Sequence, residues 1–487
     1  MELQSAANVG VRVRVRMYRQ GLGDCFLLSF STDTRSFHML VDCGVFRGTE
    51  GAKEKMNAVA ENIKLATEPD GLDVLVATHQ HWDHLSGFLQ AREVFDRLGV
   101  GSVWVAWTED PNNPVARRLK ETQATRLQAL TNVVTKKKFD AIDPGMRQGI
   151  SEILGFFGEN DLGVTGSITT KQALDYVMGK AKAHFCVPGK EPIALAELPG
   201  IRFYILGPPQ DPVLLKRSNP SRGDSKVYEA NLGLDADAAF LAATQPDYQD
   251  SQGYVPASVD EDRQWHCFPF DRSYRISLDR AKRDSFFSSR YFESAFEYRK
   301  IGSDWLNWSQ QLALNLDNDT NNTSLAFAIE LIASKKVILF PADAQVGNWL
   351  SWSSLSWTIR EANREERKVT ANDLLQRTVL YKVGHHGSHN ATLREKGLEL
   401  MSSPDLVAMI PVDAVFAQAP PRHWKMPFEP LYDRLSEKCK GRVLRADRTW
   451  PRNDAAKPDA LSDTEWERFK KSVVVDLKNL YIDITVS

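Results

Sequence analysis

The sequence lacks any apolar run long enough to cross a membrane. Such a run needs roughly 20 predominantly apolar residues, and none of that length occurs in the 487 residues. The amino terminus also lacks a basic stretch followed by an apolar one, so we expect no secretory signal. These absences predict a cytoplasmic protein that does not interact with a membrane.

Paired cysteines and an excess of charge of one sign are lacking as well. The five cysteines are odd in number and widely scattered, and no two have C-x-x-C spacing. This argues against a disulfide framework and against a cysteine zinc site. Charged residues make up 25% of the chain but leave a formal net charge of only −2. No overall field therefore attracts a nucleic acid or an acidic membrane.

What the sequence does contain is a dense group of metal-binding side chain types after a short apolar segment. Residues 72–77 are mostly apolar and predict a buried strand. His79 and His81 would then point to the same side, because side chains alternate along an extended chain. Asp83 and His84 lie on the turn that follows. Imidazole and carboxylate together suit zinc, manganese or iron rather than calcium; a polar loop without a metal is the alternative.

The H-x-H-x-D-H pattern resembles the second motif of the metallo-β-lactamase superfamily of di-metal hydrolases. A G-x-G-D turn at 21–24 and a strand ending in D-x-G at 42–44 resemble the start of the metallo-β-lactamase domain of ComEC-type competence proteins. In the superfamily the aspartate of D-x-G steadies the metal loop, so the resemblance implies that Asp42 supports the ligands. The resemblance covers segments near 11–110, 196–210 and 319–450.

Two later strand ends extend the resemblance. Asp343 follows an apolar strand at the place of the carboxylate that bridges both metals in the superfamily, although Ala342 replaces the usual glycine. The G-H-H-G-S segment at 384–388 resembles the final ComEC-type motif. It implies that one of His385 and His386 binds metal, while the other donates a hydrogen bond to a substrate or leaving group. The sequence does not decide between them; we assign the metal to His385 and the catalytic contact to His386.

One ligand of the superfamily is missing. Many of its hydrolases have a further histidine between the first cluster and the bridging aspartate. Here only His184 and His266 lie in that interval, both within insertions, and ComEC-type domains share the absence. The metal nearest His79 and His81 is therefore short of protein ligands, and we expect it to bind weakly or exchange.

Two long segments interrupt the resemblance, and both concentrate basic residues. Residues 111–195 are polar and mostly helical in pattern, and 111–148 hold eight Lys or Arg against three Asp or Glu. Residues 213–318 begin as loop, then interleave basic and aromatic side chains from 271 to 300, as platforms for single-stranded nucleic acid do. The alternative, which we favour for both segments, is helices with solvated basic faces and aromatics packed on a core.

The resemblance implies an α+β fold, a four-layer αββα metallo-β-lactamase sandwich with two long, largely helical or loop insertions. We expect core segments at 1–110, 196–212 and 319–487, separated by insertions at 111–195 and 213–318. Three local patterns refine this expectation. Alternating Val and Arg over 11–16 predict a strand with valines inward and arginines in water. Apolar spacing predicts a helix over 52–67, and another helix is expected from about 88 to 98.

The expected ligands imply a metallo-hydrolase that uses a metal-bound hydroxide. It would hold two divalent metal ions, zinc or manganese, through His79, His81, Asp83, His84, Asp343 and His385. Asp83 would also accept a proton, and His386 would neutralise charge on the departing oxygen. We expect phosphodiester hydrolysis, with single-stranded DNA as the substrate class.

Two other functions fit the same sequence, because a fold does not fix a function. One is hydrolysis of a small ester, a lactone or a cyclic nucleotide. The other is a metal-stabilised interaction module whose insertions bind a partner protein.

Overall fold

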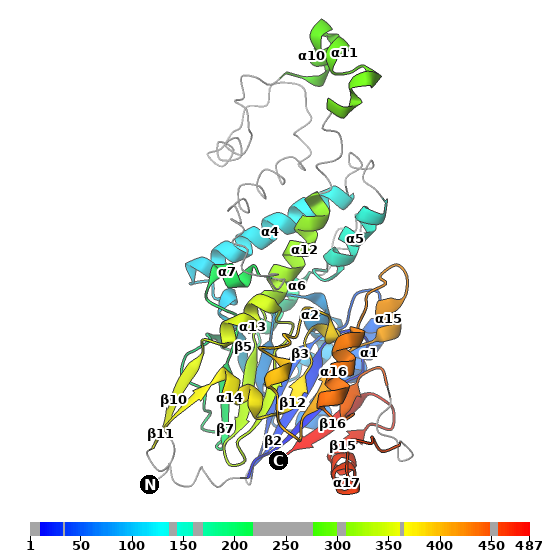
Figure 1. The fold of residues 1–487 in the computed structure, drawn as a ribbon. Helices are drawn as coiled ribbons and strands as arrows, with labels where there is room; N and C mark the ends of the chain where they lie inside the picture. The colour runs from blue at the N-terminus through cyan, green and yellow to red at the C-terminus, as the bar shows by residue number, and fades with distance from the viewer. Residues whose placement is uncertain are drawn as a thin grey trace.

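The computed structural model describes residues 10–32, 35–135, 144–158, 169–217, 276–299, 308–360, 365–448 and 456–487. Two β-sheets lie face to face, and helices cover their outer faces and one end (Figure 1). This mixed arrangement of sheets and helices is consistent with a metallo-β-lactamase domain.

The first sheet has eight strands in the order β15-β16-β1-β2-β3-β4-β5-β6. Neighbours are antiparallel as far as β3, and β3 to β6 run parallel to one another. The strands are β1 (Arg12–Tyr18), β2 (Cys25–Ser31), β3 (Ser36–Cys43), β4 (Leu72–Ala77), β5 (Val100–Ala106), β6 (Ala183–Cys186), β15 (Val473–Val475) and β16 (Tyr481–Val486).

The second sheet has six strands in the order β14-β13-β12-β9-β8-β7. The strands from β9 to β14 run parallel, whereas β7, β8 and β9 are antiparallel neighbours. The strands are β7 (Ile201–Ile205), β8 (Phe327–Leu331), β9 (Lys336–Phe340), β12 (Thr378–Lys382), β13 (Val407–Ile410) and β14 (Val443–Arg445); β10 (Ser356–Arg360) and β11 (Glu366–Thr370) form a separate hairpin.

The inner faces of the two sheets share one apolar core. Phe26 of the first sheet meets Phe340 of the second at 5.5 Å between ring centroids, and Phe30 meets Phe203 at 6.1 Å. Strands buried on both faces read as continuous apolar runs, which is why the sequence predicted them well. The residues that follow these strands are thereby fixed relative to each other.

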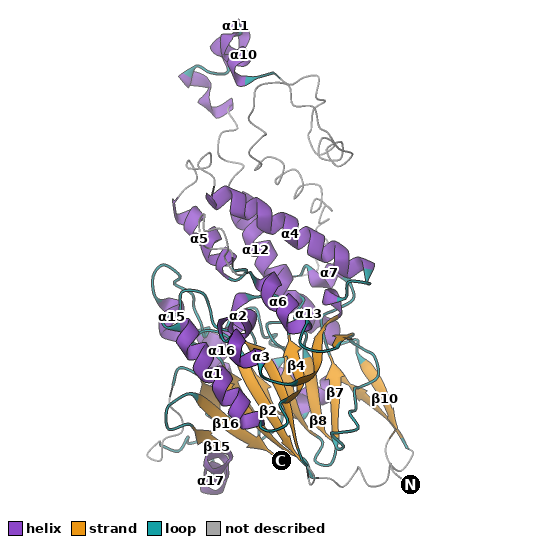
Figure 2. Ribbon diagram, turned by 180° about the vertical axis from the view of Figure 1, so that it is seen from behind, coloured by secondary structure: helices purple, strands orange, loops and turns teal. Residues whose placement is uncertain are grey.

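Helices cover the outer faces of the sheets (Figure 2). The first sheet carries α1 (Ala52–Thr67), α2 (Trp82–Gln90), α3 (Arg92–Asp96) and α6 (Thr170–Met178), and the second carries α13 (Val346–Trp352), α14 (Ala371–Gln376) and α16 (Glu429–Lys438). The other described helices are α4 (Pro114–Thr135), α5 (Pro144–Gly155), α7 (Pro212–Leu215), α10 (Leu278–Arg283), α11 (Ser285–Arg290), α12 (Trp308–Asn322), α15 (Ala414–Gln418) and α17 (Asp463–Ser472). Short 3₁₀ turns are η2 (Trp107–Glu109), η6 (Ser294–Arg299), η8 (His385–Gly387) and η9 (Leu398–Leu400). None of the described helices combines the length and apolar character that crossing a membrane requires.

Helices α4, α5 and α12 pack together at one end of the sheets (Figure 1). Arg126 on α4 forms an ion pair of 2.6 Å with Asp319 on α12, and Gln123 donates to the Thr320 hydroxyl at 3.1 Å. Helix α12 crosses the boundary expected between 318 and 319, so the end of one expected insertion packs against the helices of the other. Strand β6 also falls within 111–195, and it extends the first sheet instead of forming part of a purely helical segment.

Two local predictions were wrong. Arg16 does not face water: it is 5% exposed, since Asp483 of β16 accepts two hydrogen bonds from it, at 2.7 and 2.8 Å. The helix expected from about 88 begins at Trp82, whose main-chain nitrogen donates to Phe156 at 2.6 Å. Neither partner could be read locally, because each comes from a distant part of the chain. The helix over 52–67 is confirmed as α1.

Phe286 of the basic segment 271–300 does not pack on a core, contrary to the packing that we favoured for the aromatics of this segment. Helix α11 has no buried residue, and Phe286 is 65% exposed. Phe286 and Phe287 lie 5.4 Å apart, edge to face. Residues 271–275 and 300 lie outside the described part of the chain, as do Lys136, Lys137 and Lys138 of the first basic segment.

The buried ion pair that joins β1 to β16 generates a stability prediction. Asp483→Ala leaves the Arg16 guanidinium buried without its carboxylate, so we expect a loss of about 3–5 kcal/mol in unfolding free energy. Asp175→Ala breaks the exposed Lys171–Asp175 pair and should cost at most about 1 kcal/mol. Urea unfolding followed by circular dichroism compares the two variants; equal midpoints would contradict the prediction.

Candidate metal centre

The candidate site lies where strands of both sheets end. Asp42 lies one residue before the end of β3, His79 follows β4, Asp343 follows β9 and His385 follows β12. These strands run parallel within each sheet, so their carboxyl ends meet at one edge. Side chains that are far apart in sequence are thus brought to one place by the two sheets.

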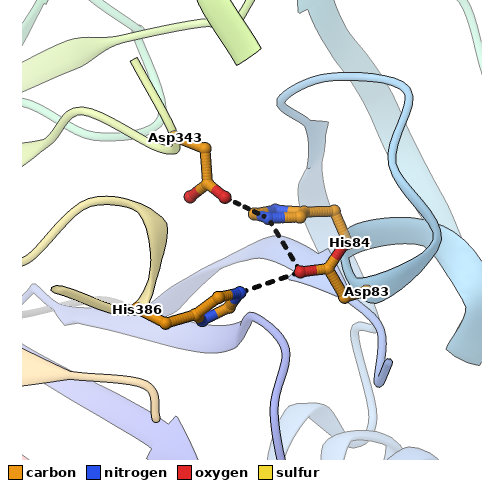
Figure 3. Close-up of side chains that lie close together, drawn as sticks. All are labelled: Asp83, His84, Asp343 and His386. Atoms are coloured by element: carbon orange, nitrogen blue, oxygen red, sulfur yellow. Dashed lines mark hydrogen bonds and ion pairs between the residues drawn. The ribbon is translucent and has the colours of Figure 1, made fainter. Parts of the chain in front are cut away.

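Four side chains form the centre of the site (Figure 3). One ligand atom from each of Asp83, His84, Asp343 and His386 lies within 4.8 Å of the others. His386 Nε2 is 2.8 Å from Asp83 Oδ2, and His84 Nε2 is 3.1 Å from Asp343 Oδ2. All four side chains are at most 1% exposed. This is a compact group of two imidazoles and two carboxylates.

Asp42 orients the loop that carries the histidines. One carboxylate oxygen accepts from the main-chain nitrogen of Thr78 at 2.8 Å, and the other accepts from the Thr78 hydroxyl at 2.7 Å. His84 Nδ1 lies 2.7 Å from that second oxygen. This contact leaves Nε2 facing Asp343, as carboxylates behind metal-binding histidines commonly do. The supporting role that the resemblance implies for Asp42 agrees with these contacts.

The two adjacent histidines after β12 occupy different environments. His386 Nδ1 lies 2.6 Å from the carbonyl oxygen of Pro411. A carbonyl only accepts, so Nδ1 donates, and the carbonyl fixes the orientation of the ring. The main-chain nitrogen of His385 donates to Asp343 at 2.9 Å, while its Nδ1 is buried and has no hydrogen-bond partner among the described residues. The structure thus places His386, and not His385, in the four-residue group.

His79 and His81 lie beside this group. Their ring nitrogens, Nε2 of His79 and Nδ1 of His81, are 3.1 Å apart. Phe156 and Phe157 pack against the His81 ring at 5.3 and 5.0 Å between centroids. The two phenylalanines follow α5, so the segment after this helix covers one side of the site.

Three residues of the site were missed in the sequence. Lys382, at the end of β12, forms ion pairs with Asp24 and with Asp343, the latter at 3.2 Å. Asp317 of α12 places its Oδ1 3.8 Å from His81 Nε2. The sequence could have indicated two of them. Lys382 ends an apolar strand two residues before the G-H-H-G-S segment, and Asp24 follows a glycine turn. Asp317 gives no local signal, because only the folded chain brings α12 to the loop.

Burial and the neighbouring charges set the protonation of the site. Burial lowers the pKa of His81 to about 3 and that of His385 to about 4, so both are neutral and ready to donate a lone pair. Burial also opposes protonation of His84, but Asp343, Asp24, Asp42 and Asp83 together outweigh it and raise its pKa. Burial, then Asp83 and Asp343, raise the pKa of Asp317 to about 8. The positively charged groups of the site therefore do not fully neutralise the charge of its carboxylates.

Several residues of the site adopt left-handed backbone conformations. Asp42, Ala342, His385 and His386 have φ values of 56°, 52°, 44° and 52°. Such conformations cost non-glycine residues about 1–2 kcal/mol each and gather at functional sites. The value at Ala342 also gives a physical reason for the glycine that the superfamily usually has there.

The buried polar atoms of the site indicate that its residues suit a divalent cation. Among the described residues of the site, five buried imidazole or carboxylate atoms lack hydrogen-bond partners: Asp24 Oδ1, His81 Nε2, Asp83 Oδ1, Asp317 Oδ1 and His385 Nδ1. Buried polar atoms without partners are costly. Neutral imidazoles and carboxylates are the ligands that zinc and manganese accept.

Comparison with known families agrees with this donor set. Residues 19–149 match the model of the metallo-beta-lactamase superfamily. The matched region includes Asp42 and all four ligand-type residues of the first loop, whereas Asp343, His385 and His386 lie beyond it. No curated protein matches the chain. The metallo-beta-lactamase match supports a metal-dependent hydrolase and does not specify its substrate.

Gly44 generates a prediction about the metal loop. A Cβ at Gly44 would overlap the main chain of Asp83 and His84. Gly44→Ala should therefore displace both ligands, lower the bound metal and cost about 1–3 kcal/mol of stability. At Gly99 a Cβ would meet nothing within 4 Å, so Gly99→Ala serves as the control. Metal analysis and thermal unfolding of both variants provide the measurement; unchanged metal content in Gly44→Ala would refute the prediction.

Proposed function

We propose that this protein is a hydrolase that binds two divalent cations, zinc or manganese, and cleaves phosphodiesters. The observation that carries the proposal is the buried group of Asp83, His84, Asp343 and His386. The superfamily match at residues 19–149 supports it. The proposal includes a four-layer αββα core interrupted by insertions at 111–195 and 213–318, and a cytoplasmic location.

The proposed ligands are His79, His81, Asp83, His84 and Asp343, with one histidine after β12. The geometry favours His386 as that histidine, because its Nδ1 donates to Pro411 and its Nε2 faces the group, as in metal-binding histidines generally. His385 then takes the substrate contact. The two histidines would exchange the roles assigned from the sequence.

A divalent cation held by these residues would lower the pKa of a water toward neutrality and would neutralise charge as an ester bond breaks. Asp343 holds its position by accepting from the His385 main chain and from Lys382. Asp83 keeps Oδ1 without a partner among the described residues, so this oxygen is available to accept a proton. The aromatic cover of Phe156 and Phe157 limits the access of bulk water.

Single-stranded DNA is the substrate class we propose. Phe286 is exposed and is the second residue of α11, which follows the basic helix α10. Exposed aromatic side chains among basic residues can stack on nucleic-acid bases. The basic residues of α4 support the same proposal. Polyanions bind such surfaces by neutralising phosphates and releasing counterions.

A second candidate, hydrolysis of a small ester, lactone or cyclic nucleotide, is favoured by a cavity. A cavity of about 430 Å³ lies between α4, α7 and α12, within the size range of small-molecule sites. Lys120 in its wall donates to Gln80 at 2.8 Å, and Gln80 lies between His79 and His81. Arg118 and Lys216 also line the cavity, which suits an anionic substrate.

The proposed function predicts close to two transition-metal ions per chain. Asp343→Ala removes the shared carboxylate, so we expect the metal content to fall to one or fewer and hydrolysis of a chromogenic phosphodiester to be lost. Asp459→Ala, at an exposed position, should keep both. Elemental analysis before and after dialysis against zinc or manganese provides the measurement. A parent protein that takes up no metal would refute the enzyme proposal.

The DNA proposal predicts binding that weakens steeply with salt. The log–log slope should be about −0.7 per contacted phosphate on a single strand. Replacing Arg280, Lys282 and Arg283 of α10 with Gln should flatten that slope and leave turnover of a small phosphodiester unchanged. The control replaces three exposed lysines elsewhere, Lys53, Lys55 and Lys478. Fluorescence anisotropy with an oligonucleotide provides the measurement; salt-independent or absent binding would favour the small-molecule alternative.

A further inference from the structure

We propose that Asp317 of α12 is a metal ligand that, together with His79 and His81, completes the cation site left short by the missing histidine. The inference rests on the proposed function, since it requires that the protein bind metal. It assigns to the second insertion a direct part in the metal centre.

The position of Asp317 carries the inference. Its Oδ1 lies 3.8 Å from His81 Nε2, and neither atom has a hydrogen-bond partner within the described residues. The separation is too long for a hydrogen bond. It is close to that of two ligands of one cation, which lie about 3.3 Å apart when each bond is about 2.0–2.1 Å. Two buried, unpartnered ligand atoms thus face each other.

The carboxylate of Asp317 is held in this orientation. Asn321, one helical turn later, donates to Oδ2 at 3.3 Å, which leaves Oδ1 directed at His81. Helix α12 is fixed by the Arg126–Asp319 pair and by Gln123 on Thr320. Both contacts come from α4, so the first insertion positions the helix that carries Asp317.

The charge around Asp317 favours a cation. Lys382, the buried ammonium group of the site, pairs with Asp24 and Asp343 instead of Asp317. The Asp317 side chain is only 15% exposed, and a largely buried carboxylate without a paired cation is costly. A divalent ion between His81 and Asp317 would compensate this charge and satisfy both unpartnered atoms.

The ordinary alternative is a protonated, purely structural Asp317. It would keep the carboxyl neutral beside Asp83 and Asp343 and would require no metal. The two explanations differ in their effect on cation affinity, which can be measured without any substrate.

The experiment titrates the metal-free full chain with zinc, followed by calorimetry, and with cobalt, followed by its visible absorption. Asp317→Asn, of nearly the same size, should weaken one of the two cations at least ~10-fold, as loss of a ligand or of its support does, and alter the cobalt spectrum. Asp459→Asn removes the same charge at an exposed position outside the site and should leave both cations bound. Asp317→Glu, which keeps a carboxylate, should retain the second cation.

The outcomes distinguish a failure of the proposed function from a failure of the role assigned to Asp317. A parent chain that binds no zinc or cobalt overturns the proposed function itself. A parent chain that binds two cations, with Asp317→Asn binding both as tightly, overturns the role of Asp317 alone. If Asp317→Asn does not fold by circular dichroism, the comparison of Asp317→Glu with the parent decides: parent-like affinity and a shifted cobalt spectrum support a ligand, and an unchanged spectrum contradicts it.

Discussion

The concentration of buried charge at the strand ends is the constraint on which the structure depends. Asp24, Asp83 and Asp343 are each at most 2% exposed, and burying a carboxylate without compensation costs several kcal/mol. Lys382 and the protonated form of His84 offset part of this charge. The negative charge that is not offset, together with the unpartnered polar atoms, is the physical reason that the site suits cations.

This charge can be assembled only because the main chain approaches very closely. Gly44 lies against the main chain of Asp83, and the main-chain nitrogen of Asp24 donates to the carbonyl oxygen of Asp83 at 3.0 Å. Ala342, His385 and His386 hold left-handed conformations next to the strands that fix them. The two sheets supply the rigidity that such strain requires. The glycine turn and the D-x-G segment are therefore parts of the site, although neither supplies a proposed metal ligand.

The sequence predicted what is determined locally. Apolar runs predicted β4, β9 and β12, and the histidines after β4 and β12 and the aspartate after β9 mark the strand ends where the site forms. Burial of Arg16 by Asp483, the early start of α2 and the place of Asp317 were not predicted. Each depends on a contact between segments far apart in the chain, for which neither spacing nor composition provides a signal. Phe286 was misjudged for a related reason: interleaved basic and aromatic residues do not tell whether the aromatics face a core.

Segments outside the two sheets surround the buried site residues. Phe156 and Phe157 after α5 pack against His81, and Asp317 of α12 faces it from another direction. A cavity lies between α4 and α12, and Lys120 in its wall donates to Gln80, which stands between His79 and His81 in the chain. Because the same helices line the cavity and position Asp317, the shape of the cavity and the orientation of Asp317 depend on one packing arrangement. Any change that separates α4 from α12 should alter both together.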